Sequence, residues 1–218
     1  MTRSPPQAEP LVLAGGAGAL EAVLETPADA GPASACMVIC HPHPLHGGTM
    51  HNKVVTTLAR CAHELGAPTI RFNFRGVGAS AGSFDDGRGE AADALTAVEW
   101  ARQRFPGAAL WLAGFSFGGY VALRASTTRG VGLVERLVTV APALGRNYGS
   151  VREIAVPACP WLIVQGDADD VIDGNVVIDW AGQLQPPPQL AVLPGVGHFF
   201  HGQLTTLQQL VVPFLRGA

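Results

Sequence analysis

A serine between two glycines is the pattern in this chain that most directly indicates chemistry. The run Gly114-Phe-Ser-Phe-Gly-Gly119 contains a Gly-x-Ser-x-Gly motif centred on Ser116. It follows a short apolar stretch and opens a helical one, the context in which such a serine occupies a sharp strand-to-helix turn with its hydroxyl exposed. A glycine-rich turn with an incidental serine is the alternative. The flanking elements and the further glycine favour a nucleophile.

A nucleophilic serine needs a base, because its hydroxyl is weakly nucleophilic at neutral pH, and the base needs a third group that fixes its tautomer. His198, in Gly195-Val-Gly-His-Phe-Phe200, lies between the last expected strand and the last expected helix. A loop at this place can carry an imidazole to the serine. His201 is the rival, but loop histidines are usually solvated. Position and the preceding small residues favour His198.

The third group is expected among four aspartates that follow a strand, in Gly166-Asp-Ala-Asp-Asp-Val-Ile-Asp173. A calcium loop is disfavoured, because the D-x-[DN]-x-[DN]-G spacing and a terminal glutamate are missing. Asp167 still belongs to the turn that leaves the strand, and Asp173 stands at a helix start, where aspartate caps backbone N–H groups. The residues themselves leave Asp169 and Asp170 open.

A loop of histidines and prolines, His41-Pro-His-Pro-Leu-His-Gly-Gly48, follows another expected strand. Nucleophile elbows of this kind take one oxyanion N–H from the residue after the serine, here Phe117, and a second from such a loop. Proline has no N–H, so His43 and Leu45 are the candidates. The alternative is a metal site made by the loop histidines and His51, but imidazoles two residues apart across prolines match no familiar ligand pattern.

A second glycine-rich loop, Arg75-Gly-Val-Gly-Ala-Ser-Ala81, imitates the start of a dinucleotide-binding fingerprint. The fingerprint requires a helix directly after the glycines. Here the next residues, Gly82-Ser-Phe-Asp-Asp-Gly87, are typical of a turn. We therefore interpret this segment as a structural loop.

The elements around these loops alternate between strand and helix. An apolar hairpin joining Leu11–Leu13 to Leu20–Leu24 comes first, and the glycines inside it argue against a signal peptide. Strands are then expected at Ala35–Cys40, Thr69–Phe74, Ala108–Ala113, Leu133–Val140, Trp161–Gln165 and Gln189–Leu193, and helices at Asn52–Leu65, Glu90–Phe105, Gly118–Ser126, Val176–Leu184 and Leu204–Leu215. This alternation predicts a mostly parallel sheet with helices on both faces and a site at the carboxyl ends of its strands.

Composition narrows the function classes. The chain has 218 residues, 48% hydrophobic and 14% charged, which suits a single globular domain over residues 1–218. A formal charge of −3 without a basic patch argues against nucleic acid as a partner. No apolar run reaches the ~20 residues that span a bilayer, so no membrane partner is expected. The spacing of the four cysteines favours reduced thiols and a cytoplasmic protein.

Taken together, the Ser116 elbow, the Gly166-x-x-Asp169 loop, the Gly-His198 loop and Arg75-Gly-x-Gly-x-Ser80 resemble the α/β-hydrolase superfamily over nearly the whole chain. The histidine and proline run is similar to a bacterial group of small predicted serine esterases related to the dienelactone-hydrolase-like branch. Enzymes of that branch carry a cysteine nucleophile where this sequence has serine, which argues against a dienelactone substrate. The expected chain order of the triad, serine, then acid, then histidine, is present.

The resemblance implies the roles that the residues alone left open. The superfamily's acid stands three residues after the glycine, which implies Asp169, and alignment of the histidine and proline loop implies Leu45 as the second oxyanion donor. The implied reaction is acyl transfer to water from a small ester or thioester, with no cofactor. Superfamily lids are commonly inserted after the strand that follows the elbow helix, and Ala141–Pro160 leaves no room for such a domain. A thioesterase or acyl transferase, or a non-catalytic binding protein, remains the alternative.

Overall fold

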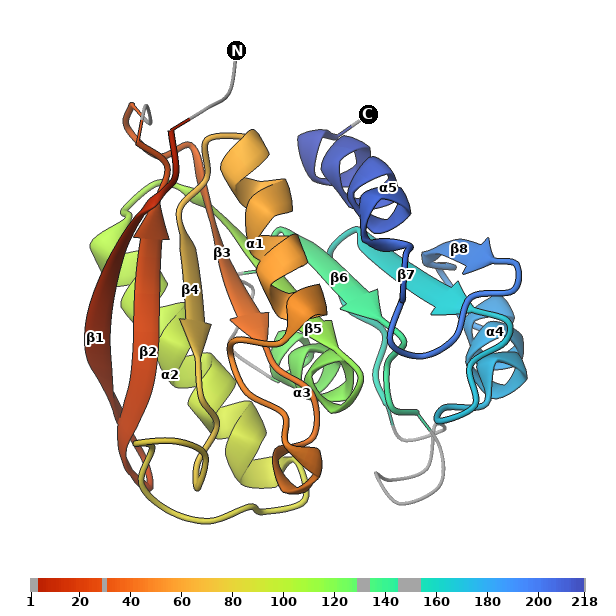
Figure 1. Ribbon diagram of the computed structural model, residues 1–218, viewed down its shortest axis with the longest axis horizontal. Coiled ribbons are helices and arrows are strands. Elements are labelled where there is room, and N and C mark those ends of the chain that lie inside the picture. Colours follow the sequence, from red (N-terminus) through yellow and green to blue (C-terminus); the bar gives the residue numbers. More distant parts are fainter. Residues whose placement is uncertain (1–3, 29–30, 129–133, 145–153, 218) are drawn as a thin grey trace.

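Eight strands form one sheet in the computed structural model, which describes residues 4–28, 31–128, 134–144 and 154–217. The order across the sheet is β1-β2-β4-β3-β5-β6-β7-β8 (Figure 1). The strands are β1 (Gln7–Gly15), β2 (Gly18–Thr26), β3 (Ala35–Cys40), β4 (Thr69–Phe72), β5 (Ala109–Phe115), β6 (Arg136–Val140), β7 (Trp161–Gly166) and β8 (Gln189–Leu193).

The sheet is parallel except at one edge. The hairpin β1–β2 is antiparallel, and β2 also pairs antiparallel with β4, whereas all pairs from β4 to β8 are parallel. The predicted hairpin is therefore confirmed, and both of its strands are longer than the sequence pattern indicated. Parallel neighbours need long crossovers, and four of these contain the helices α1 (Lys53–Glu64), α2 (Arg88–Arg104), α3 (Phe117–Ser126) and α4 (Gly174–Gly182). A fifth helix, α5 (Leu204–Arg216), follows the last strand.

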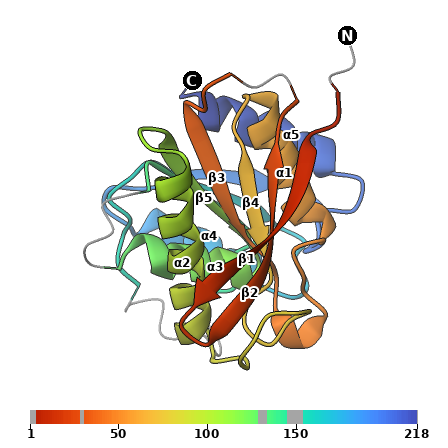
Figure 2. The ribbon, with the colours of Figure 1, turned by 90° about the vertical axis from the view of Figure 1, so that its left-hand side faces the viewer.

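Helices cover both faces of the sheet, as predicted. The helices α1 and α5 lie on one face and α2, α3 and α4 on the other (Figures 1 and 2). Strand β3 shows why, because all six of its residues are buried and successive side chains point to opposite faces. Met37 and Ile39 pack in the core under α1 and α5, while Val38 packs in the core under α2 and α3. Each such apolar side chain contributes about 1.5–3 kcal/mol on burial.

Helix α1 illustrates how local sequence sets an element's bounds. The side chain of Asn52 accepts a hydrogen bond from the N–H of Val54 at 2.8 Å and caps the first turn. The helix ends at Glu64 with Leu65 as its C-cap, and Gly66 follows with a positive φ of 76°, the conformation that glycine adopts most readily. The helix predicted over Asn52–Leu65 is confirmed.

Some predicted bounds were wrong. The strand expected over Thr69–Phe74 ends at Phe72, because the N–H of Phe74 donates to the side chain of His41 and not to a neighbouring strand. Leu133, the expected start of β6, lies outside the described residues. In the connection from β6 to β7, residues 141–144 and 154–160 form no helix or strand, and 145–153 are not described.

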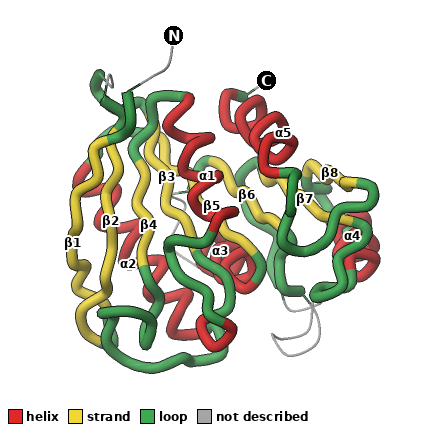
Figure 3. Tube along the Cα trace, in the orientation of Figure 1, coloured by secondary structure: helices red, strands yellow, loops and turns green. Residues whose placement is uncertain are grey.

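The loops that follow the parallel strands gather at one edge of the sheet, shown in green below the strands in Figure 3. These are the loops in which the sequence placed every candidate functional residue. Within the described residues, none of the helices has the length and apolar character needed to cross a membrane.

Candidate active site

Ser116 occupies the sharp turn between β5 and α3. Its backbone has φ 57° and ψ −121°, a left-handed conformation that costs a non-glycine residue about 1–3 kcal/mol. Its N–H donates to the carbonyl of Val140 at 2.9 Å, which ties the turn to β6. A Cβ on Gly114 would collide with the carbonyl of Gly118, so strand and helix approach this closely only because both positions are glycine.

His198 connects the serine to Asp169. The imidazole Nε2 lies 2.9 Å from Ser116 Oγ, and Nδ1 lies 2.8 Å from Asp169 Oδ2. An imidazole that donates from Nδ1 to the carboxylate accepts the serine proton at Nε2, the arrangement that activates a hydroxyl. Ser116 and His198 are both buried. The structure thus brings together three side chains that are far apart in the sequence.

The carboxylate of Asp169 is held from two sides. Oδ1 accepts the N–H groups of Val171 at 2.9 Å and Ile172 at 2.8 Å, and Oδ2 accepts the side-chain N–H of Gln165 at 3.2 Å as well as that of His198. Burial acts to raise the pKa of Asp169, but the hydrogen bonds from His198 and from these backbone groups outweigh it and lower the pKa. The group is therefore a carboxylate at neutral pH.

The three other aspartates of this loop lie elsewhere. Asp167 accepts the N–H of Gly195 at 2.7 Å and joins two loops, and Asp170 is exposed. Asp173 accepts the N–H of Asn175 at 3.1 Å and caps α4, as predicted. His201 is exposed, and its ring centroid lies 5.9 Å from that of Phe199.

The histidine and proline loop is anchored by His41, which is fully buried. Its Nε2 accepts the N–H of Phe74 at 3.0 Å, so its Nδ1 carries the proton and donates to the carbonyl of Pro42 at 2.6 Å. Burial lowers the pKa of His41 to about 4, opposed by the hydrogen bond to Pro42. A neutral imidazole thus connects the end of β4 with the loop after β3.

The two predicted oxyanion donors differ in their surroundings. Phe117 follows the serine directly and begins α3, so its N–H belongs to the first turn of a helix. Leu45 lies in the 3-10 turn η1 (Pro44–His46), is 69% exposed, and donates its N–H to His43 Nδ1 at 3.1 Å. That hydrogen bond must break before Leu45 can hold an oxyanion. Both assignments stay predictions, as does the alternative donor His43, whose ring packs on that of Phe117 at 5.0 Å.

The structure gives the loop histidines no shared metal geometry. In the described ranges, no three His, Cys, Asp or Glu side chains are grouped as metal ligands. Both nitrogens of His41 are engaged in hydrogen bonds to the backbone.

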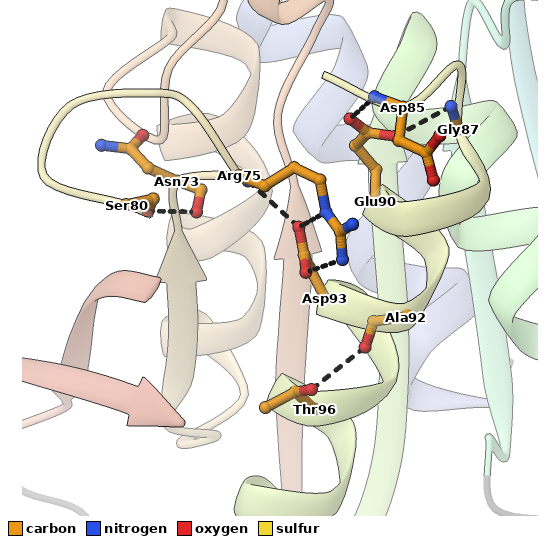
Figure 4. A network of polar contacts seen from close by, with 9 residues as sticks. All are labelled: Asn73, Arg75, Ser80, Asp85, Gly87, Glu90, Ala92, Asp93 and Thr96. Carbon is orange, nitrogen blue, oxygen red and sulfur yellow. Dashed lines mark hydrogen bonds and ion pairs between the residues drawn. The ribbon is translucent and has the colours of Figure 1, made fainter. Parts of the chain in front are cut away.

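The second glycine-rich loop is fastened to α2. Arg75 donates to both carboxylate oxygens of the buried Asp93, at 2.7 and 3.0 Å, and its own N–H donates there too (Figure 4). Glu90 accepts the N–H groups of Asp85 and Gly87 further along the same loop. The loop is therefore a structural one, as interpreted from the sequence.

Sequence reasoning missed Gln165. Its side chain is buried, and its Nε2 donates to the carbonyl of Gly166 as well as to Asp169, while its Oε1 has no hydrogen-bond partner among the described residues. Flipping the amide would bring Oε1 against two acceptor oxygens, so these two acceptors fix its orientation. The available signal was a single amide at the end of the apolar run Trp161–Val164.

Comparison with known proteins shows what the chain is similar to. The family model described as "Serine aminopeptidase, S33" matches residues 31–158. An uncharacterized protein of Rickettsia prowazekii is 30% identical over 191 residues, covering 84% of this chain and 79% of that protein. The solved structure of a Xanthomonas campestris "a/b serine hydrolase without lid" is 41% identical with a TM-score of 0.88, covering 99% of this chain and 97% of the other. A dienelactone hydrolase from Anabaena variabilis shares the fold. It is 20% identical with a TM-score of 0.77, covering 98% of this chain and 99% of that one.

Proposed function

Because this chain belongs to the α/β serine hydrolases, in the family described as serine aminopeptidase S33, we propose that it cleaves small carboxylic esters through an acyl-enzyme intermediate. Ser116 is the nucleophile, His198 the general base and Asp169 the acid that orients the histidine. The observation that supports this proposal is the continuous hydrogen-bonded chain from Ser116 Oγ through the imidazole to Asp169 Oδ2.

The mechanism follows from these contacts. Ser116 Oγ attacks the ester carbonyl while its proton passes to His198 Nε2, and Asp169 stabilises the imidazolium. The oxyanion of the tetrahedral intermediate is held by backbone N–H groups, for which we propose Phe117 and Leu45. His198 then gives its proton to the leaving alkoxide. Water, deprotonated by the same imidazole, releases the acid and restores the serine. No step draws on a metal or an organic cofactor.

The expected partner is a free small-molecule ester, and neither nucleic acid nor a membrane. The negative formal charge and the scattered cations support the first exclusion. All four cysteines are free thiols, three of them buried, which supports work in a reducing compartment such as the cytoplasm. Fractionation of the source cells, followed by immunodetection, tests this location, and recovery in the envelope or the medium would contradict it.

A fluorophosphonate probe tests the function directly, because it labels only an activated serine. We expect labelling at Ser116, located by peptide mass, and turnover of p-nitrophenyl acetate. Ser116→Ala should abolish labelling and lower kcat by about 10³-fold or more with the fold intact. Ser83→Ala, in an exposed loop, is the control that should leave both unchanged.

Three outcomes separate the alternatives. Near-native turnover by pure Ser116→Ala protein would remove the serine from its role. An unlabelled wild-type protein without esterase activity would indicate a binding protein. Faster hydrolysis of acetyl-CoA than of any simple acetate ester would indicate a thioesterase.

A further inference from the structure

We infer that the site selects esters of apolar, uncharged alcohols, and that Phe199 is the residue that binds the alcohol part. The inference rests on the proposed function, because it takes His198 as the group that protonates the leaving alkoxide. It concerns the part of the site that binds the alcohol, which the triad chemistry does not define.

The position of the leaving group follows from the position of its proton donor. His198 Nε2 lies 2.9 Å from Ser116 Oγ, and the leaving oxygen must come within hydrogen-bond distance of the same nitrogen. Carbon atoms attached to that oxygen therefore lie beside the imidazole. Whatever side chain flanks the imidazole on its accessible side contacts the alcohol.

Two phenyl rings flank the imidazole, and only one is accessible. Phe115 lies 5.1 Å away between ring centroids and is fully buried. Phe199 lies 5.2 Å away, nearly perpendicular to the imidazole at 84°, and is 54% exposed. Its edge-to-face contact with His198 fixes one side of the ring, and the ring of His201 lies 5.9 Å away between centroids; because Phe199 is 54% exposed, part of its ring stays available to a ligand.

Three of the six large apolar side chains that are exposed among the described residues lie in loops at the carboxyl ends of the strands. These are Leu45, Val171 and Phe199, in the loops that follow β3, β7 and β8. The other three lie within elements: Val12 on β1 at the far side of the sheet, Val176 on α4 and Val192 on β8. Apolar side chains placed around a nucleophile favour an apolar ligand over a hydrated one.

The charges around the site also favour an uncharged leaving group. In the described parts of the loops after the parallel strands, five exposed aspartates occur: Asp85, Asp86, Asp167, Asp170 and Asp173. Arg75 is the one Arg or Lys in those described parts, and its guanidinium is hydrogen-bonded to Asp93. Lys53 and Arg88 are the first residues of the helices that follow two of the loops. Within the described residues these loops carry a net negative charge, which repels anionic leaving groups such as phosphorylated alcohols.

Three acetate esters with alcohols of similar leaving ability test the inference: ethyl, benzyl and 4-carboxybenzyl acetate. We expect kcat/KM to be highest for benzyl acetate. Phe199→Ala should lower the benzyl-to-ethyl ratio about five- to tenfold, and Phe199→Leu should lower it less. Val12→Ala is the matched control, an exposed apolar residue remote from the site, and should leave the ratio unchanged. The 4-carboxybenzyl ester should be disfavoured, and less so in 1 M salt, where the screening length falls to about 3 Å.

An unchanged ratio in Phe199→Ala, or an equal fall for ethyl and benzyl acetate, would overturn the inference while leaving the proposed function in place. A wild-type preference for the 4-carboxybenzyl ester would overturn it too. Failure of the wild-type protein to hydrolyse all three esters, together with no fluorophosphonate labelling, would instead overturn the proposed function.

Discussion

Asp169 and His198 form a buried pair, and each side chain also makes hydrogen bonds on the side that faces away from the other. The imidazole contacts the carboxylate at 2.8 Å through Nδ1 and the serine hydroxyl at 2.9 Å through Nε2. The carboxylate is held in turn by the backbone of Val171 and Ile172. Because both groups are held on their far sides, we expect the imidazole to keep its position when a substrate binds, and changes to the pair should appear in kcat.

The first prediction compares Asp169→Asn with Asp170→Asn. An amide at position 169 can hold His198 in the wrong tautomer and cannot stabilise its cation, so kcat should fall by about 10³- to 10⁴-fold with an intact fold. Asp170 is exposed and outside the hydrogen-bonded chain, so its variant should lose little. Parallel rate measurements decide, and the assignment is wrong if the larger loss falls on Asp170.

The second prediction concerns Gln165. Gln165→Leu removes the donor at 3.2 Å from the carboxylate oxygen that also faces His198, a hydrogen bond of about 1 kcal/mol. We expect kcat to fall up to about tenfold with KM nearly unchanged. Gln165→Glu should be worse, because it places a carboxylate beside a carboxylate. Gln103→Leu, which removes an exposed amide bonded to Glu99, is the control. Equal kinetics for Gln165→Leu and the wild type would show that the acid needs no such support.

The third prediction is a pH dependence of stability that originates at His41. Burial lowers its pKa to about 4, whereas in the unfolded chain the value is about 6.5. Between these values only the unfolded chain binds the proton, so this contribution is complete above pH 6.5 and declines as the pH falls towards 4, by at most ~1.4 kcal/mol per unit.

Urea unfolding at pH 7, 6 and 5 measures this effect. His41→Gln should be less stable at pH 7, since it disturbs two hydrogen bonds, but its stability should decline less steeply with acid. His51→Gln changes an exposed histidine and should keep the wild-type slope. An unaltered slope in His41→Gln would contradict the prediction.

The fourth prediction contrasts two ion pairs on helix α2. Asp93→Ala leaves the guanidinium of Arg75 largely buried without its partner, which should lower the free energy of unfolding by about 3 kcal/mol. Glu99→Ala breaks a 3.6 Å pair with Arg102 in which both side chains are solvated, and should cost less than about 1 kcal/mol. Thermal unfolding of the two variants measures the difference, and similar losses would refute the structural role of the Arg75 loop.

The features that depend on a few adjacent residues could be predicted from the sequence. The Ser116 elbow requires small residues on both sides of the turn, and Asn52 and Asp173 cap helices with their own neighbours, so each could be predicted from a few adjacent residues. The fold class followed from the alternation of elements and is confirmed by the sheet order.

What the sequence could not provide depends on contacts between distant segments. Strand β4 ends early because the side chain of His41 accepts the N–H of Phe74, 33 residues away. No local pattern predicts that hydrogen bond. The support that Gln165 gives to Asp169 depends on how one loop folds back over the end of β7. The hydrogen bond from Leu45 to His43 is local, and the role of Leu45 as an oxyanion donor stays a prediction.

The crowding around the elbow has an evolutionary consequence. A side chain on Gly114 would collide with the Gly118 carbonyl, and one on Gly118 with the Cys40 carbonyl, so neither position can change without moving Ser116. Leu45 and Phe199, in contrast, have exposed side chains. We therefore expect substitutions that alter the bound ligand to accumulate at such exposed positions among related proteins, while Gly114 and Gly118 stay glycine.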